Sequence, residues 1–256
     1  MKKLNFRTPF FIVVSCFLLA SCNSKEELKT SDTRALDSIS LFMKAMENNE
    51  LDYSTRLKQA NKALQKIENK KSDARIERIL GYKIYLFGNL KQPDSAINTN
   101  KALVQLNIAK NDSVAIASNY YRLAYYYLLF DKKDSAFIAN KQSQEIYMKL
   151  GDSAKIGQNL AQMAIIQSDL GDFIGSDNTA IQALKYLDKD NLEYRASVYN
   201  CIAISAKKRK DYKEAIYWYH KAIESSTISS NKAIRSSNLA ITYGHLKKYD
   251  TSIAIF

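Results

Sequence analysis

A small residue, alanine or serine, recurs at a nearly constant distance along most of this 256-residue chain. Successive positions are separated by 40, 40, 39 and 37 residues, in the order Ala96, Ala136, Ser176, Ala215 and Ser252. Self-similarity at such a period is typical of solenoids, in which one helical unit is stacked repeatedly. The chain has only seven glycines and two prolines, which is little material for the turns of a sheet-rich fold. The sequence therefore predicts an all-α solenoid of antiparallel helix pairs.

A second set of positions keeps a fixed distance from the small residues. In four copies sixteen residues separate the first position from the small one: Tyr120 and Ala136, Leu160 and Ser176, Tyr199 and Ala215, and Ser236 and Ser252. A large side chain on one helix needs a small one opposite it where an antiparallel partner crosses closely. The small residues therefore predict where the two helices of each pair cross.

The clearest copy reads Tyr199-x2-Ile202-Ala203-x2-Ala206, followed by Ala215-x3-Tyr219. This pattern resembles the tetratricopeptide repeat, W-x2-L-G-x2-Y followed by A-x3-F, over roughly residues 34–256. Alanine replaces the usual glycine, the closing proline is missing, and the period exceeds the usual 34 residues. The resemblance implies a right-handed superhelix of about six helix pairs.

Both ends of the repeat region are less regular. Residues 33–49 and 53–68 are predicted to form an early helix pair from their periodicity alone. The pattern stops at Phe256, inside the second helix of a repeat, so the last pair is expected to be incomplete. We therefore expect the chain to be part of a longer protein.

The first 22 residues, MKKLNFRTPFFIVVSCFLLASC, have the anatomy of an export signal. A basic start precedes an apolar run of 11 residues from Phe10 to Ala20, which is short of the roughly 20 that a membrane-spanning helix needs. We expect a signal peptide over residues 1–21, a flexible tether over 22–33 and the repeat domain over 34–256.

The end of this leader, Leu19-Ala20-Ser21-Cys22, resembles the lipobox of bacterial lipoproteins. The resemblance implies a diacylglyceryl thioether on Cys22 and acyl chains such as palmitate, which together would hold the chain on a membrane. Asn23, which follows the cysteine, is similar to the pattern sent to the outer membrane. The expected location is therefore the bacterial cell envelope, with the outer membrane favoured over the inner one.

Cysteine, histidine and charge patterns exclude several kinds of site. Cys16 lies in the leader and Cys22 would carry lipid, which leaves Cys201 without an intramolecular disulfide partner. His220 and His245 stand alone, so no metal site and no cofactor are expected. No catalytic motif is present, and the chain is not expected to be an enzyme.

The net charge is +12, or +9 once the three basic leader residues are removed, because 35 basic residues then face 26 acidic ones. The lysines are spread along the chain rather than massed, which favours a solvated basic surface. Nucleic-acid binding would rest on this charge alone, and export argues against it. No small-molecule substrate is indicated.

Tetratricopeptide solenoids resemble one another in holding peptides in a groove lined mainly by the first helix of each pair. On this register the groove candidates are Tyr121, Tyr125 and Leu128, then Ala161 and Ile165, then Asn200, Ile204 and Lys207. For each of them, packing against neighbouring helices is the alternative role. The resemblance implies a lipid-anchored envelope protein that binds proteins or peptides. The alternative is the extracytoplasmic sensor portion of a signalling protein with a histidine kinase or helix-turn-helix output.

Overall fold

The computed structural model describes residues 51–67 and 74–255, and every regular element in these ranges is an α-helix. The elements are α2 (Tyr53–Ile67), α3 (Ala74–Asn89), α4 (Pro93–Ala109), α5 (Ser113–Leu129), α6 (Lys133–Leu150), α7 (Ser153–Leu170), α8 (Phe173–Tyr186), α9 (Leu192–Lys208), α10 (Tyr212–Glu224), α11 (Ser229–His245) and α12 (Tyr249–Ile255). The predicted signal peptide, Cys22, the tether and the helix over 33–49 lie outside the described residues. The all-α fold is confirmed.

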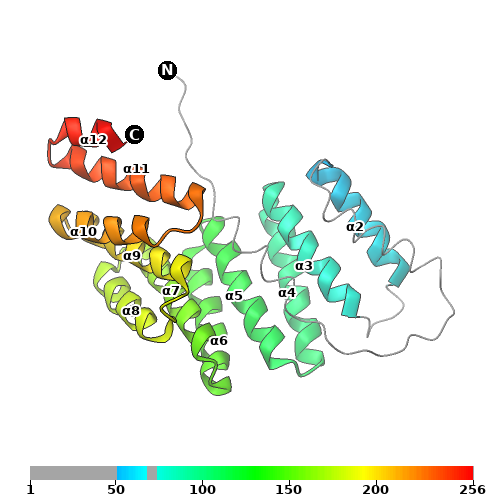
Figure 1. Ribbon diagram of the computed structural model, residues 1–256. Helices are drawn as coiled ribbons and strands as arrows, with labels where there is room; N and C mark the ends of the chain where they lie inside the picture. The colour runs from blue at the N-terminus through cyan, green and yellow to red at the C-terminus, as the bar shows by residue number, and fades with distance from the viewer. Residues whose placement is uncertain (1–50, 68–73, 256) are drawn as a thin grey trace. The chain divides into compact units, whose positions relative to one another are not determined.

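The helices fall into two compact units, one ending at Leu150 and the other beginning at Gly151. In the first unit, each helix from α2 to α6 packs against the next one along the chain. In the second unit, α7 to α12 pack in the same sequential way, and α7 also contacts α9 (Figure 1). Within each unit the chain is therefore a stack of helix pairs joined by short turns, as the repeat predicts.

The small residues lie where the sequence places the helix crossings. Ala96, Ala136, Ser176 and Ala215 are each fully buried. In the serine copies the hydroxyl adds a hydrogen bond across the crossing. Ser176 Oγ donates to the carbonyl of Ala164 over 2.8 Å, and Ser252 Oγ donates to the carbonyl of Ala240 over 2.8 Å. A serine therefore joins the two helices of its pair by a bond that alanine cannot make.

Seven of the described turns between helices reverse the chain through one residue with a left-handed backbone. Two of these residues are Gly151 and Gly171, but the others are not glycine: Lys91, Asn111, Asp131, Lys210 and Lys247, with φ between 55° and 68°. A backbone bond then closes the helix end. At the α9–α10 turn the Asp211 amide donates to the carbonyl of Ala206 over 2.9 Å. This closure satisfies carbonyls that the helix end leaves without partners.

Aspartates begin five of the described helices by accepting a backbone hydrogen bond at the third helical position. The capping residues are Asp52, Asp112, Asp152, Asp172 and Asp211, with contacts of 2.9 to 3.1 Å. Such caps satisfy an amide that would otherwise lack a partner and place negative charge at the positive end of the helix dipole.

Candidate ligand-binding surface

Three of the predicted groove residues lie on α5, and all three side chains are half-buried: Tyr121, Tyr125 and Leu128. Tyr121 and Tyr125 are four residues apart and share a helix face. The ring of Tyr125 meets that of Tyr126 edge-on, with centroids 5.2 Å apart. Burial raises the pKa of Tyr125 to about 12, so its phenol is neutral at physiological pH. This part of the surface is aromatic and carries hydroxyl groups without negative charge.

The remaining candidates lie on α7 and α9, which contact each other within the second unit. Ile165 on α7 and Asn200, Ile204 and Lys207 on α9 are all half-buried, whereas Ala161 is buried. The Oδ1 atom of Asn200 is buried and has no hydrogen-bond partner among the described residues. Burial lowers the pKa of Lys207, whose Nζ lies 5.7 Å from the ring centroid of Tyr219. These two helices therefore present an apolar side chain between an amide and an ammonium group.

One residue that the sequence did not indicate lies on α5, next to Tyr121. Arg122 on α5 is half-buried, and its guanidinium points at α3, where a Cβ added to Gly81 would lie 3.3 Å from Nη1. The absence of a side chain at Gly81 leaves room for the guanidinium. Nothing in the sequence pairs these two positions, which are 41 residues apart. Only the position of Arg122 directly after Tyr121 could have drawn attention to it.

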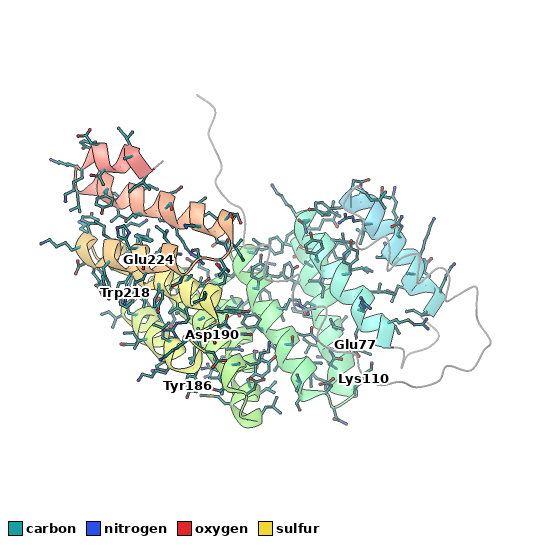
Figure 2. The ribbon with its side chains drawn as sticks, viewed as in Figure 1. Glu77, Lys110, Tyr186, Asp190, Trp218 and Glu224 are labelled. Carbon is teal, nitrogen blue, oxygen red and sulfur yellow. The ribbon has the colours of Figure 1, made fainter. Side chains whose placement is uncertain are left out.

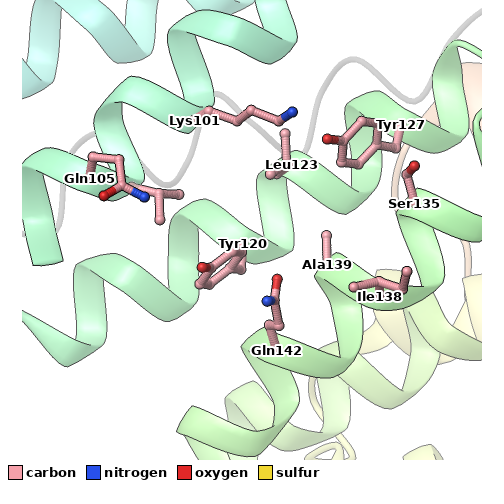
Figure 3. Close-up of a pocket in the computed structure, with 10 residues that line it drawn as sticks. Lys101, Gln105, Tyr120, Leu123, Tyr127, Ser135, Ile138, Ala139 and Gln142 are labelled. Atoms are coloured by element: carbon pink, nitrogen blue, oxygen red, sulfur yellow. The ribbon is translucent and has the colours of Figure 1, made fainter.

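A separate pocket of about 320 Å³ opens between α4, α5 and α6 (Figure 3). Its walls include Tyr120, Leu123 and Tyr127 of α5, with Lys101 and Gln142 on the flanking helices. Tyr120, Leu123 and Tyr127 are the positions that the repeat pattern assigns to packing. None of the predicted groove residues lines this pocket. The sequence did not predict it.

Trp218 of α10, to which the repeat assigns no role, is a packing residue (Figure 2). Its ring stacks on that of Tyr199 with centroids 5.6 Å apart, and its Nε1–H donates to Glu214 over 3.3 Å. The Nζ of Lys221 lies 4.7 to 5.9 Å from the ring centroids of Tyr199, Tyr217 and Trp218. These residues therefore join α9 to α10 by aromatic stacking and cation–π contact.

Cys201 is buried, and its sulfur lies 3.4 Å from the Ser176 hydroxyl. Burial raises the pKa of its thiol to about 12. Both histidines are exposed, and His245 stacks on Tyr212 with ring centroids 5.4 Å apart. The described residues contain no group of three or more side chains suited to hold a metal ion. None of the described helices is both long and apolar enough to cross a bilayer.

No family model and no curated protein matches this chain. Solved structures do match. A Rap protein complexed with competence and sporulation factor superposes with a TM-score of 0.66 at 16% identity, covering 90% of this chain and 65% of that one. A STAND protein with a tetratricopeptide repeat sensor from Pyrococcus horikoshii gives 0.64 at 16% identity, over 86% of this chain and 35% of that one. A tetratricopeptide repeat protein from Parabacteroides merdae gives 0.60 at 12% identity, over 86% and 77%.

These likenesses define the class of protein. The chain has the fold of the tetratricopeptide-repeat solenoids, as the spacing of its small residues predicts. Because the sequence identities are only 12 to 16%, the similarity to these structures shows the fold alone.

Proposed function

We propose that the chain is a non-catalytic scaffold that binds a protein or peptide through first helices, on α5 in one unit and on α7 and α9 in the other. The observation that carries this proposal is the shared exposure of seven predicted groove residues, all half-buried at regular offsets on α5, α7 and α9. At the helix crossings, Ala96, Ala136, Ser176 and Ala215 are fully buried, so their surroundings differ from those of the groove residues. Half-buried aromatic, aliphatic and amide groups on ordered helices suit a binding surface.

The solved relatives support the same kind of role. One is a Rap protein in complex with competence and sporulation factor, and another carries its tetratricopeptide repeats as a sensor.

The proposal includes a lipid anchor at Cys22 and a place in the bacterial envelope, with the outer membrane favoured. It rests on the sequence Leu19-Ala20-Ser21-Cys22 and on the leader before it. A Cys22→Ala variant should no longer incorporate labelled palmitate, and it should leave the membrane fraction. Palmitate incorporation that persists in this variant would exclude Cys22 as the attachment site.

Site-specific photo-cross-linking in cells tests the binding surface. A photoreactive phenylalanine analogue at Tyr121, on α5, should capture a partner, whereas the same analogue at Tyr186, an exposed tyrosine of α8, should not. Capture from position 186 alone would place the binding surface on the second helices and contradict the proposal.

A matched pair of isoleucine variants then measures the contribution of α9. Ile204→Ala should weaken binding of the captured partner about tenfold, since a partly exposed isoleucine gains burial in a complex. Ile181→Ala, on the second helix α8 and 49% exposed, should leave the affinity unchanged. Circular dichroism confirms that both variants keep their helices.

The second candidate function is the sensor portion of a signalling protein, which the likeness to the STAND protein favours, since that protein contains a tetratricopeptide repeat sensor. In this case partner binding would alter the activity of an output module. Adding the partner should then change transcription or phosphorylation in wild-type cells but not in cells that lack the gene, and an equal response in both would exclude the sensor role.

A further inference from the structure

Arg122 has no anionic or carbonyl partner among the described residues, unlike Arg195, Arg209 and Arg235. Arg235 binds Glu193, Arg209 binds Asp177, and Arg195 donates to backbone carbonyls. For Arg122, by contrast, the described residues contain no carboxylate within ion-pair distance and no hydrogen-bond acceptor in contact. A guanidinium carries five N–H donors and is charged at neutral pH. At Arg122 these donors are left to solvent or to a ligand.

Among the described residues, no carboxylate compensates the charge of Arg122. The ionisable groups that act on its charge are the phenols of Tyr126 and Tyr147. Burial raises the pKa of Tyr126 above its ordinary value, so its hydroxyl stays neutral. Burial also lowers the pKa of Arg122 itself, which means that its charge is held at a cost in solvation. An anion arriving here would recover part of that cost.

We propose that Arg122 binds a carboxylate side chain of the partner polypeptide, so that the surface of α5 selects an acidic segment. This inference rests on the proposed scaffold function and assigns a chemistry to its ligand. A planar guanidinium matches a carboxylate in a two-bond geometry that neither water nor an ammonium group reproduces.

The position of Arg122 along α5 favours a side-chain carboxylate over a chain terminus. Arg122 lies near the middle of the helix, with Tyr121 on one side and Tyr125 and Leu128 on the other. A ligand that uses all these residues must continue past Arg122 in both directions. The carboxylate therefore comes from aspartate or glutamate within the segment.

Two glycines of α3 leave room for side chains of α5. Gly81 of α3 leaves the space that its Nη1 fills. Gly88, further along α3, lies against the ring of Tyr126, where an added Cβ would come within 2.7 Å of a ring carbon. The first of these glycines gives the Arg122 guanidinium its place beside α3.

Arginine side-chain NMR of the full chain tests the inference with defined peptides. The Nε–H signal of Arg122, assigned by its loss in Arg122→Gln, should shift saturably with a tetraglutamate peptide blocked at both ends. A blocked tetraglutamine peptide should leave it in place. Arg122→Gln should weaken tetraglutamate binding about tenfold, the loss expected for one charge-assisted interaction.

The matched control is Arg78→Gln, which removes the same charge from an exposed position on α3. It should change the affinity less than twofold. Circular dichroism of both variants separates loss of binding from loss of fold. An unshifted Arg122 signal at millimolar tetraglutamate, or equal shifts of Arg78 and Arg122, would overturn the inference.

Two further outcomes show where the carboxylate comes from and whether the Arg122 contact can fail while the scaffold function stands. If the Arg122 signal shifts only with tetraglutamine that has a free C-terminal carboxylate, then Arg122 binds a chain terminus. This result would refute the proposal that it binds an acidic side chain. Partner capture at Tyr121 that is undiminished in Arg122→Gln would refute the carboxylate contact while leaving the scaffold function standing.

Discussion

Arg235 of α11 and Glu193 of α9 form a largely buried ion pair, with 2.7 Å between Nη2 and Oε1. The same carboxylate accepts hydrogen bonds from the Thr227 amide and the Asn231 side chain, both over 2.9 Å. The guanidinium in turn donates to Ser197 over 3.1 Å. One carboxylate thus joins α9, the loop before α11 and α11 itself, which fixes adjacent helix pairs to each other.

Replacing Arg235 with methionine should destabilise the second unit by about 3 kcal/mol, because it leaves the Glu193 carboxylate buried without its cation. Urea denaturation followed by circular dichroism measures the change. The double variant Glu193→Gln with Arg235→Met should recover part of the loss. A single variant as stable as the wild type would show that the pair contributes little.

The Glu193 carboxyl should also make stability depend on acid. Desolvation raises its pKa, but hydrogen bonds from Arg235 and Asn231 and the charge of Arg235 outweigh this and hold it below the ordinary value of 4.5. A carboxyl with a depressed folded pKa stabilises the fold above its ordinary pKa, and this contribution is lost as pH falls through the folded value. Stability should therefore fall below about pH 4.5 more steeply in the wild type than in Glu193→Gln. Urea titrations from pH 7 to pH 3 measure the free energy of unfolding of both proteins. If the two curves of stability against pH run parallel, Glu193 is not the source of the acid dependence.

The crossing residues should tolerate no added volume. Ala136→Leu inserts three carbons between α5 and α6 at a fully buried position, and overpacking of this kind costs about 1 to 3 kcal/mol or more. Ala102→Leu makes the same change at an exposed position of α4 and should be nearly neutral. Thermal melting of the two variants compares them directly, and equal melting temperatures would mean that residue 136 is not a close crossing.

Glycine at a left-handed turn position should stabilise the chain. Lys91 has a φ of 55°, a conformation that is strained for a residue with a Cβ. Lys91→Gly should therefore raise stability by about 0.5 to 1 kcal/mol, after the greater freedom of glycine in the unfolded chain is subtracted. Lys141→Gly, exposed within α6, should instead lower stability by about 1 kcal/mol. Chemical denaturation measures the change in the free energy of unfolding for both variants. A destabilised Lys91→Gly variant would exclude strain at this turn.

Cys201 should resist thiol reagents while the chain is folded. Burial raises the pKa of its thiol to about 12, and the thiolate is the reactive form. Iodoacetamide at pH 8, followed by peptide mass spectrometry, should modify Cys201 only after unfolding in urea. Rapid modification of the native chain would show that the crossing next to Ser176 opens readily.

The sequence predicted the fold well because its signal is local and repeated. Ala215 and Ser176 occupy crossing positions because only small side chains fit there, and this requirement recurs in each copy. Asp211 could be recognised as a cap because capping depends on the following three residues. The turns were harder to predict, because Lys210 adopts a left-handed backbone that its side chain does not favour, and the backbone bond from Asp211 to Ala206 stabilises it.

The binding surface was only partly predictable. The register places Tyr125 and Ile204 on first helices, and the structure finds both half-buried, but whether they contact a ligand stays a prediction. Arg122 and Gly81 are 41 residues apart, and their relation depends on how α3 and α5 pack. Glu193 and Arg235 likewise meet only through tertiary structure, which no local pattern encodes.

The sequential packing of helices within each unit has a consequence for how quickly the chain reaches its native state. Most contacts join a helix to the next one along the chain, so few long loops must close before native contacts form, and low contact order is associated with rapid folding. Because each repeat depends mainly on its neighbours, structure can nucleate at any sufficiently stable pair and spread in both directions. Pairs can therefore begin to form on a nascent chain before synthesis of the next repeat is finished.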